Sequence, residues 1–343
     1  MMLSEDLAMP PLSGARPLGE AEAAGLLAPL AAADRVLLAV SGGADSLALM
    51  VLAARWAAVL PGRPALAVAT VDHGLRTNSA AEAAHVGGLA ASLGLPHAIL
   101  AWRGRKPTTG IEEAARGVRY RLLAAHARKI RASHLATAHT LDDQAETVLL
   151  RLAAGSGPAG LAAMRAATPL GPLTHVRPLL GVPKGRLVAT LREAGIAWCE
   201  DETNRDPAFA RARLRAAKAA LAREGLTDAR LARLATRAAR AEDALAAVAV
   251  AFWQQSARAD SRSVEIDGAM FLAQPEEIRL RTIGRAVVLA GGGDVRLARL
   301  EALGATIDAA LASGKRAVRT LAGARVESNG RRLRVTPAPP RRA

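Results

Sequence analysis

The sequence predicts an α/β fold, in which a parallel, doubly wound sheet is followed by a smaller helical or α+β domain. Short apolar runs alternate with helix-length segments through the first half of the chain, a pattern typical of parallel sheets covered on both faces. Polar residues gather directly after these runs, where such sheets bind ligands. The length of 343 residues suits two domains.

Four apolar runs are expected to form strands, at residues 35–40, 66–71, 97–101 and 134–138. A helical pattern follows each of them, at residues 47–60, 79–93, 112–129 and 141–152. Beyond a glycine-rich loop the pattern is less regular, with further helices expected at residues 186–194, 208–223 and 226–253. The change of domain is placed within residues 215–226.

We therefore divide the chain into an N-terminal arm (1–30), the sheet domain (31–215) and a linker helix with a C-terminal domain (216–343). The last part is expected to contain helices at 276–289 and 297–311. A hairpin is expected around Asn329-Gly330, which is a strong turn signal, and the tail from residue 336 is expected to be disordered.

The positive charge of the chain is concentrated. The net charge is +15, and the excess lies in residues 205–240, with 10 basic and 3 acidic side chains, and residues 315–343, with 9 and 1. Such segments favour a polyanion such as nucleic acid. An arginine bias from a GC-rich genome is the alternative, although it would spread the arginines more evenly. Aromatic residues are only 2% of the chain, so platforms for stacking bases are few.

The single cysteine, Cys199, excludes an internal disulfide framework, a zinc ribbon and a multi-cysteine iron–sulfur site. The longest apolar stretch, residues 244–253, is too short to cross a membrane, and the acidic N-terminus does not resemble a secretory signal. We expect a cytoplasmic protein without a membrane partner.

A phosphate-binding loop is expected directly after the first strand. The segment Ser41-Gly42-Gly43-Ala44-Asp45-Ser46 opens a helix, where glycines let the backbone approach an anion and the N–H groups and helix dipole favour phosphate. It is neither a Walker sequence nor GxGxxG. The alternative is an ordinary turn with an N-capping serine.

Three acids begin the helix after the fourth strand. Asp142, Asp143 and Glu146 are expected to lie off the buried stripe, and Asp143 and Glu146 share a face, which suits an ammonium group or Mg²⁺. Capping by Thr140 with Asp143 is the structural alternative. The expected stripe consists of Leu141, Ala145, Val148, Leu149 and Leu152.

Other polar residues carry weaker signals. His73 follows the second strand and could be only a turn residue, whereas Arg116 and Arg119 could pair along their own helix. Residues 200–206 are most simply a capping loop. The arginines at 211, 213 and 215 suit either a solvated helix face or phosphate contacts.

Several segments, both in their sequence and in their order along the chain, resemble the tRNA(Ile)-lysidine synthase family of PP-loop ATP pyrophosphatases. They are SGGADS, VDHGLR, GIEEAARGVRYRLL, ATAHTLDDQAETVLLRLAAGSG, RPLL and WCEDETN, and the match covers residues 36–215. SGGxDS alone is shared by many PP-loop enzymes, whereas HxxDDQxET followed by EDxTN is more specific. Phe209 and Ala212 stand where the family usually has Tyr and Asn, which leaves the hydrogen bonds of those side chains open.

The resemblance implies an ATP- and Mg²⁺-dependent ligase for tRNA(Ile) with a CAU anticodon. Such an enzyme adenylates the wobble cytidine, and free L-lysine then displaces AMP to form lysidine. It further implies that residues 41–46 and His73 bind ATP, and that Asp143 and Glu146 hold lysine. Asp45 would meet Mg²⁺ or lysine, and Arg116 or Arg119, with Arg211, would stabilise developing negative charge. The metal ligands stay unassigned, and a homodimer is compatible with the resemblance.

Two alternatives stay open. Another PP-loop tRNA-modifying enzyme, such as a thiolase, would need more cysteines than Cys199 alone. A non-catalytic RNA-binding protein with a vestigial nucleotide site would not need the intact SGGADS and the three carboxylates.

Overall fold

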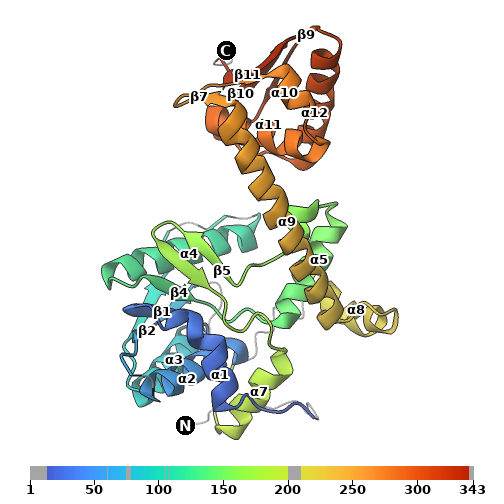
Figure 1. Cartoon of the computed structure of the whole chain (residues 1–343). Coiled ribbons are helices and arrows are strands. Elements are labelled where there is room, and N and C mark those ends of the chain that lie inside the picture. The colour runs from blue at the N-terminus through green and yellow to red at the C-terminus, as the bar shows by residue number, and fades with distance from the viewer. Residues whose placement is uncertain are drawn as a thin grey trace. The chain divides into compact units, whose positions relative to one another are not determined.

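The structure is a computed structural model of the chain, and it describes residues 14–59, 61–74, 79–104, 106–107, 109–199 and 210–339. Its contacts form two compact units (Figure 1). Unit 1 comprises Met1–Leu152 with Ala163–Ala235, and unit 2 comprises Ala153–Ala162 with Thr236–Ala343. The division between them falls inside helix α9 (Asp228–Ser256), later in the chain than the change of domain expected at residues 215–226.

Unit 1 is built on a six-stranded sheet in the order β3-β2-β1-β4-β6-β5. The four expected strands are present as β1 (Arg35–Ala39), β2 (Ala65–Asp72), β3 (His97–Ala101) and β4 (His134–Ala136), and all are parallel. The hairpin of β5 (Ala167–Leu170) and β6 (Leu173–Val176) was not expected. Strand β6 is parallel to β4, and only β5 runs antiparallel. The α/β fold class is thus confirmed, with one antiparallel edge strand.

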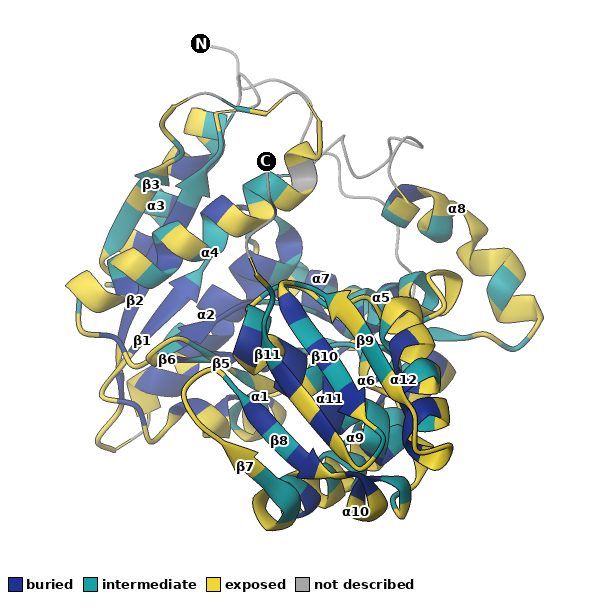
Figure 2. Ribbon diagram, turned by 90° about the horizontal axis from the view of Figure 1, so that it is seen from above, coloured by how far each residue is buried: buried dark blue, intermediate teal, exposed yellow. Residues whose placement is uncertain are grey.

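Helices cover both faces of this sheet because side chains alternate along each strand. Val36 and Leu38 pack into a cluster with one set of helices, whereas Leu37 faces a second cluster that includes α4 (Ile111–Lys129). The first set consists of α1 (Glu20–Leu27), α2 (Ala44–Val59), α3 (Ser79–Ser92) and α7 (Lys184–Glu193), with the 3₁₀ turn η1 (Ala28–Leu30) beside α1. Buried residues concentrate on the central strands β1, β2 and β4 and on α2 (Figure 2).

A smaller cluster joins α5 (Leu141–Ala153) to the start of α9, next to α8 (Ala210–Arg223). Ala145 and Val148 are buried there, as expected for the apolar stripe of α5. Leu152 is exposed, so its expected burial is wrong, because α5 ends one residue later. Glu146 lies off the stripe but is buried nonetheless, because an arginine of α8 covers it.

Unit 2 has an α+β fold, and the short helix α6 (Pro158–Leu161) belongs to it although it precedes the rest of the unit in the chain. Its antiparallel sheet has the order β7-β8-β11-β10-β9, and α11 and α12 contact its strands. The bounds are β7 Ala257–Ala259, β8 Val264–Asp267, α10 Gly268–Leu272, α11 Glu276–Gly291, α12 Leu297–Ala312, β9 Arg316–Leu321, β10 Ala324–Asn329 and β11 Arg332–Pro337. The α+β prediction for this part of the chain is confirmed.

The hairpin expected at Asn329-Gly330 joins β10 to β11. The Asn329 side chain accepts the N–H groups of Arg331 (3.0 Å) and Arg332 (2.8 Å), and Gly330 has a φ of 87°, which favours glycine. Thr336 and Pro337 belong to β11, so the disorder expected for these two residues is wrong, and residues 340–343 lie outside the described part. Searched over its described residues, the structure has no helix with the length and hydropathy to cross a membrane.

Candidate active site

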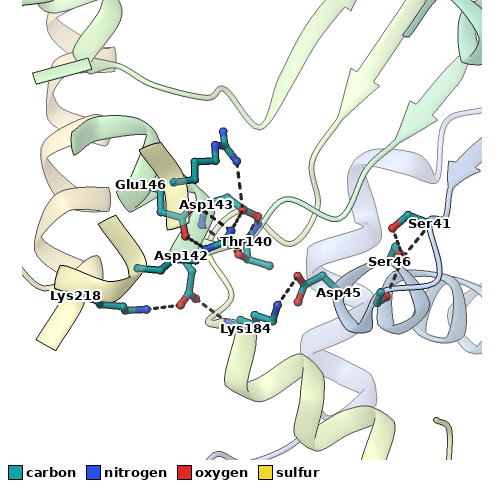
Figure 3. Close-up of polar contacts among 12 residues, drawn as sticks. Ser41, Asp45, Ser46, Thr140, Asp142, Asp143, Glu146, Lys184 and Lys218 are labelled. Carbon is teal, nitrogen blue, oxygen red and sulfur yellow. Dashed lines mark hydrogen bonds and ion pairs between the residues drawn. The ribbon is translucent and has the colours of Figure 1, made fainter. Parts of the chain in front are cut away.

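The loop after β1 is a tight turn closed by Ser46 (Figure 3). The Ser41 N–H donates to Ser46 Oγ over 3.1 Å, and that hydroxyl donates to the Gly43 carbonyl over 2.9 Å. Gly42 has a φ of +95°, a conformation that side-chain-bearing residues rarely adopt. Helix α2 begins at Ala44, so the strand, loop and helix order required for an anion site is present.

Asp45 is a partly buried acid whose charge is incompletely balanced by its neighbours. Burial raises the pKa of its carboxyl to about 6, against the opposing effect of Lys184, whose Nζ lies 3.6 Å from Oδ2. Its other oxygen, Oδ1, is buried and has no hydrogen-bond partner within the described residues. A carboxylate in this condition suits a cationic ligand, such as an ammonium group or a metal ion.

Asp143 both caps α5 and faces two cations. One carboxylate oxygen accepts the Thr140 N–H (2.9 Å) and hydroxyl (3.0 Å), and the Thr140 hydroxyl accepts the Asp143 N–H (3.3 Å). The capping interpretation is therefore confirmed. The second oxygen, Oδ1, lies 3.9 Å from both Arg211 and Arg215. Capping leaves this oxygen facing long cationic side chains and available to a ligand.

Glu146 and Asp142 have closer partners. Arg215 donates to both oxygens of Glu146, over 2.5 and 3.1 Å, yet burial still raises the pKa of Glu146. Asp142 is also partly buried, but the Lys184 N–H (2.9 Å) and Lys218 Nζ (2.5 Å) donate to it and lower its pKa. Glu146 is thus paired with Arg215 and Asp142 with Lys218, and Figure 3 shows the second of these pairs.

A cluster of arginines borders the same end of the sheet. Arg116 and Arg119 of α4 lie 5.4 and 5.3 Å from the centre of the Tyr120 ring. Burial first, and then the charges of Arg119, Arg177, Arg116 and Arg211, lower the pKa of His139 to about 3. Of the two expected α4 arginines, Arg119 exerts the larger effect on this histidine.

His73 directly follows Asp72, the last residue of β2. Its ring meets Trp102 edge-on at 6.1 Å, and the preceding Asp72 accepts the Gly74 N–H over 2.8 Å. Residues 75–78 and 200–209, with the capping loop and Phe209, lie outside the described part. Ala212 is buried on α8, so an asparagine there would need buried hydrogen-bond partners.

Several residues that complete the network were not expected from the sequence. Lys184 and Lys218 pair with its acids, and Thr137, His175 and Arg177 surround His139. His139 lies in the expected polar segment after β4, which was the available signal. No group of three or more His, Cys, Asp or Glu side chains arranged to hold a metal ion occurs among the described residues.

Comparisons with known proteins agree with this architecture. A family profile described as a PP-loop domain matches residues 19–219. The tRNA(Ile)-lysidine synthase of Bradyrhizobium sp. (strain BTAi1) is 50% identical over 95% of this chain and 96% of its own length. That of Methylobacterium nodulans is 51% identical over 91% and 93%. Among solved structures, the U34-tRNA thiolase NcsA from Methanococcus maripaludis has a TM-score of 0.51 at 17% identity, covering 59% of this chain and 71% of that one. The last similarity concerns the fold alone.

Proposed function

The chain belongs to the tRNA(Ile)-lysidine synthase family, and we propose that it ligates L-lysine to the wobble cytidine of a CAU-anticodon tRNA(Ile). It is an ATP-using PP-loop ligase. The observation that carries the proposal is the group of acids and arginines behind the phosphate loop, in a chain about half identical to these synthases over nearly its whole length. The reaction would take place in the cytoplasm, where tRNA and ATP are found.

The first step would be adenylation. The C2 oxygen of cytosine attacks the α-phosphorus of ATP, pyrophosphate leaves, and C2 becomes electrophilic. Backbone N–H groups at the start of α2 and the Ser41 hydroxyl suit the phosphates, and we assign Gly42, Gly43 and Ala44 to the same cradle. Ser46 would contribute by holding the loop in shape through its bond to the Gly43 carbonyl. Mg²⁺, when bound with ATP, neutralises phosphate charge.

In the second step the lysine ε-ammonium would lose a proton, the free amine would attack C2, and the bond from C2 to the adenylate oxygen would break and release AMP. Asp143 Oδ1 and Asp45 are the acids with the loosest cationic contacts, at 3.9 and 3.6 Å, and we assign them to the lysine ammonium groups. Glu146 would hold Arg215 against the same site through its two hydrogen bonds. Arg119, Arg116 and Arg211 would stabilise negative charge on phosphate or the base. His73, at the end of β2, is assigned to the nucleotide side.

The basic segments 205–240 and 315–343 would bind the tRNA backbone, which predicts binding that weakens steeply with salt. The single-stranded anticodon loop makes unstacking of the cytosine inexpensive. A homodimer is compatible with this function, and analytical sedimentation would test whether the protein forms one.

Labelled lysine, ATP and Mg²⁺ with a CAU-anticodon isoleucine tRNA transcript would test the proposal. We expect incorporation that requires ATP and fails on a matched transcript with wobble uridine. Asp143→Asn should raise the KM for lysine, whereas Glu146→Gln should lower kcat, because it releases Arg215. Tight, salt-sensitive tRNA binding without incorporation would refute the ligase and favour the RNA-binding alternative.

A further inference from the structure

We propose that Arg177, His175 and Thr137 form a directional hydrogen-bonded chain that fixes His139 as its Nε2–H tautomer, and that they are positioning residues of the site. These residues come from two neighbouring strands. His139 and Thr137 follow β4, whereas His175 lies in β6 and Arg177 follows it, and β4 and β6 pair in parallel. The Thr137 N–H donates to the Val176 carbonyl over 3.0 Å, which holds the two segments in register.

Three hydrogen bonds connect the chain. Arg177 Nη2 lies 3.0 Å from His175 Nδ1, and His175 Nε2 lies 2.9 Å from Thr137 Oγ1. Thr137 Oγ1 in turn lies 2.8 Å from His139 Nδ1. Arg177, His175 and Thr137 are all buried, so the chain has little access to solvent that could replace one of its members.

The direction of the first bond is fixed by arginine. A guanidinium donates hydrogen bonds and cannot accept them, so His175 Nδ1 must carry a lone pair. Protonation of both ring nitrogens would place two donors against each other at 3.0 Å. His175 is therefore neutral, and its single ring proton is on Nε2.

The remaining directions follow from that proton. His175 Nε2–H donates to the Thr137 hydroxyl oxygen, and the hydroxyl's own proton is then free to point toward His139. If both rings donated to Thr137, its buried hydroxyl proton would have no acceptor among the described residues, because its hydrogen bonds there are to these two rings. We therefore take His139 Nδ1 as the acceptor of that proton. The proton of a neutral His139 is consequently on Nε2.

The surroundings keep both rings neutral. Burial and the charges of Arg177, Arg119 and Arg116 lower the pKa of His175 to about 3, with a contribution from His139, and His139 is affected similarly. Arg177 is itself held, because its Nη1 donates to the Arg165 carbonyl over 2.7 Å and to Thr168 Oγ1 over 3.2 Å. The origin of the chain is therefore a fixed, permanently charged donor.

The consequence for chemistry rests on the proposed function. His139 would present an N–H donor at Nε2, which suits an acceptor oxygen such as that of a phosphate or of the cytosine C2 carbonyl. The same ring nitrogen cannot accept a proton from the attacking lysine amine. The chain thus assigns His139 to holding an oxygen and leaves removal of the amine proton to another group.

Long-range ¹H–¹⁵N spectra of the full chain labelled at histidine nitrogens test the tautomers directly. We expect protonated Nε2 and unprotonated Nδ1 for both His139 and His175 at neutral pH, with signals assigned by their loss in H139Q and H175Q. A protonated Nδ1 on His139 would overturn the proposal. This measurement needs no turnover, so it is independent of whether the proposed ligase activity is found.

Substitutions at Thr137 test the positioning role. Thr137→Val is nearly isosteric but lacks the hydroxyl, and it should convert His139 to a mixture of tautomers and lower kcat about tenfold. The KM for tRNA should not change, and Thr137→Ser should restore both the spectrum and kcat. Should Thr137→Val fail to fold, the wild-type and serine spectra still decide the direction of the chain.

Thr70 provides a matched control in the same sheet. Its buried hydroxyl lies 2.9 Å from His97 Nε2, but no arginine is bonded to that histidine in the interactions described. Thr70→Val should leave the His139 signals and kcat unchanged. An equal fall in kcat for the two valine variants, with an unaltered His139 spectrum in both, would refute the positioning role.

Discussion

Replacing Asp45 by asparagine should stabilise the ligand-free protein while it removes activity. The carboxyl has an ordinary pKa of 3.8 that burial raises to about 6, so ionising it in the folded state at neutral pH opposes folding. At about 1.36 kcal/mol per pH unit, the cost is about 2–3 kcal/mol. The side chain is only 25% exposed, so solvent screens little of this cost. An asparagine at this position would carry no charge and would avoid the cost.

The pH dependence has a definite sign. The folded protein binds the Asp45 proton more tightly than the unfolded chain, so wild-type stability falls as the pH rises from about 4 to about 6. The advantage of Asp45→Asn should therefore be near zero at pH 4, grow through that window, and stay constant above it.

Urea titrations at several pH values would measure this difference. Trp253 is the tryptophan of unit 2, and Trp253→Phe in both proteins lets fluorescence report on unit 1. Asp72→Asn is the matched control of opposite sign, because the Gly74 N–H lowers the pKa of Asp72 and its charge favours folding. A destabilised Asp45→Asn at pH 7, or a difference that does not vary with pH, would refute the reasoning.

Three further substitutions have expected outcomes. Arg215→Gln removes the two-point partner of the buried Glu146 and should lower the free energy of unfolding by about 1–3 kcal/mol, seen as a lower urea midpoint. Gly330→Ala places a Cβ 2.2 Å from the Gly314 carbonyl at a φ of +87° and should cost unit 2 about 2–4 kcal/mol, followed through fluorescence of its tryptophan. In Gly42→Ala the added Cβ would come no closer than 3.6 Å to another side chain, so the expected cost is about 1–2 kcal/mol of backbone strain at this positive φ. The KM for ATP should also rise. An unchanged affinity for ATP would contradict the phosphate-loop assignment.

The first four strands and their helices could be predicted because local pattern and tertiary structure agree. The run at residues 35–40, for example, forms β1, in which Val36, Leu37 and Leu38 are fully buried, since an apolar run between turn residues has few other ways to bury itself. The β5–β6 hairpin has no comparable signal. Its strands have four residues each, and Pro169 within β5 is tolerated only because that strand lies at the edge of the sheet.

Which residues belong to the site could be predicted better than which of their side chains pair with one another. The sequence placed Ser41–Ser46 and the acids of α5 at strand ends, where they are found. It could not show that Arg215 would lie on Glu146, because the two are 69 residues apart and only the packing of α8 on α5 brings them together. The same applies to His175, because its hydrogen bond to Thr137 depends on the pairing of β4 with β6, a strand that was not expected.

The pairing also ranks the acids by their availability to a substrate amine. A new ammonium group at Glu146 would have to break two short, partly buried hydrogen bonds from Arg215 and leave a guanidinium without its partner. At Asp45 it would compete with Lys184, which lies 3.6 Å away, and at Asp143 Oδ1 with Arg211 at 3.9 Å, and both of these cations have side chains that are about half exposed. Arg215 also lies 3.9 Å from Asp143 Oδ1, but its hydrogen bonds are to Glu146. At Asp45 it would also satisfy a buried oxygen that has no hydrogen-bond partner in the described part of the chain. Under the proposed function, lysine therefore binds at Asp45 and Asp143, the carboxylates whose charge is least well balanced by cations in the ligand-free protein. Glu146 contributes by keeping Arg215 in place.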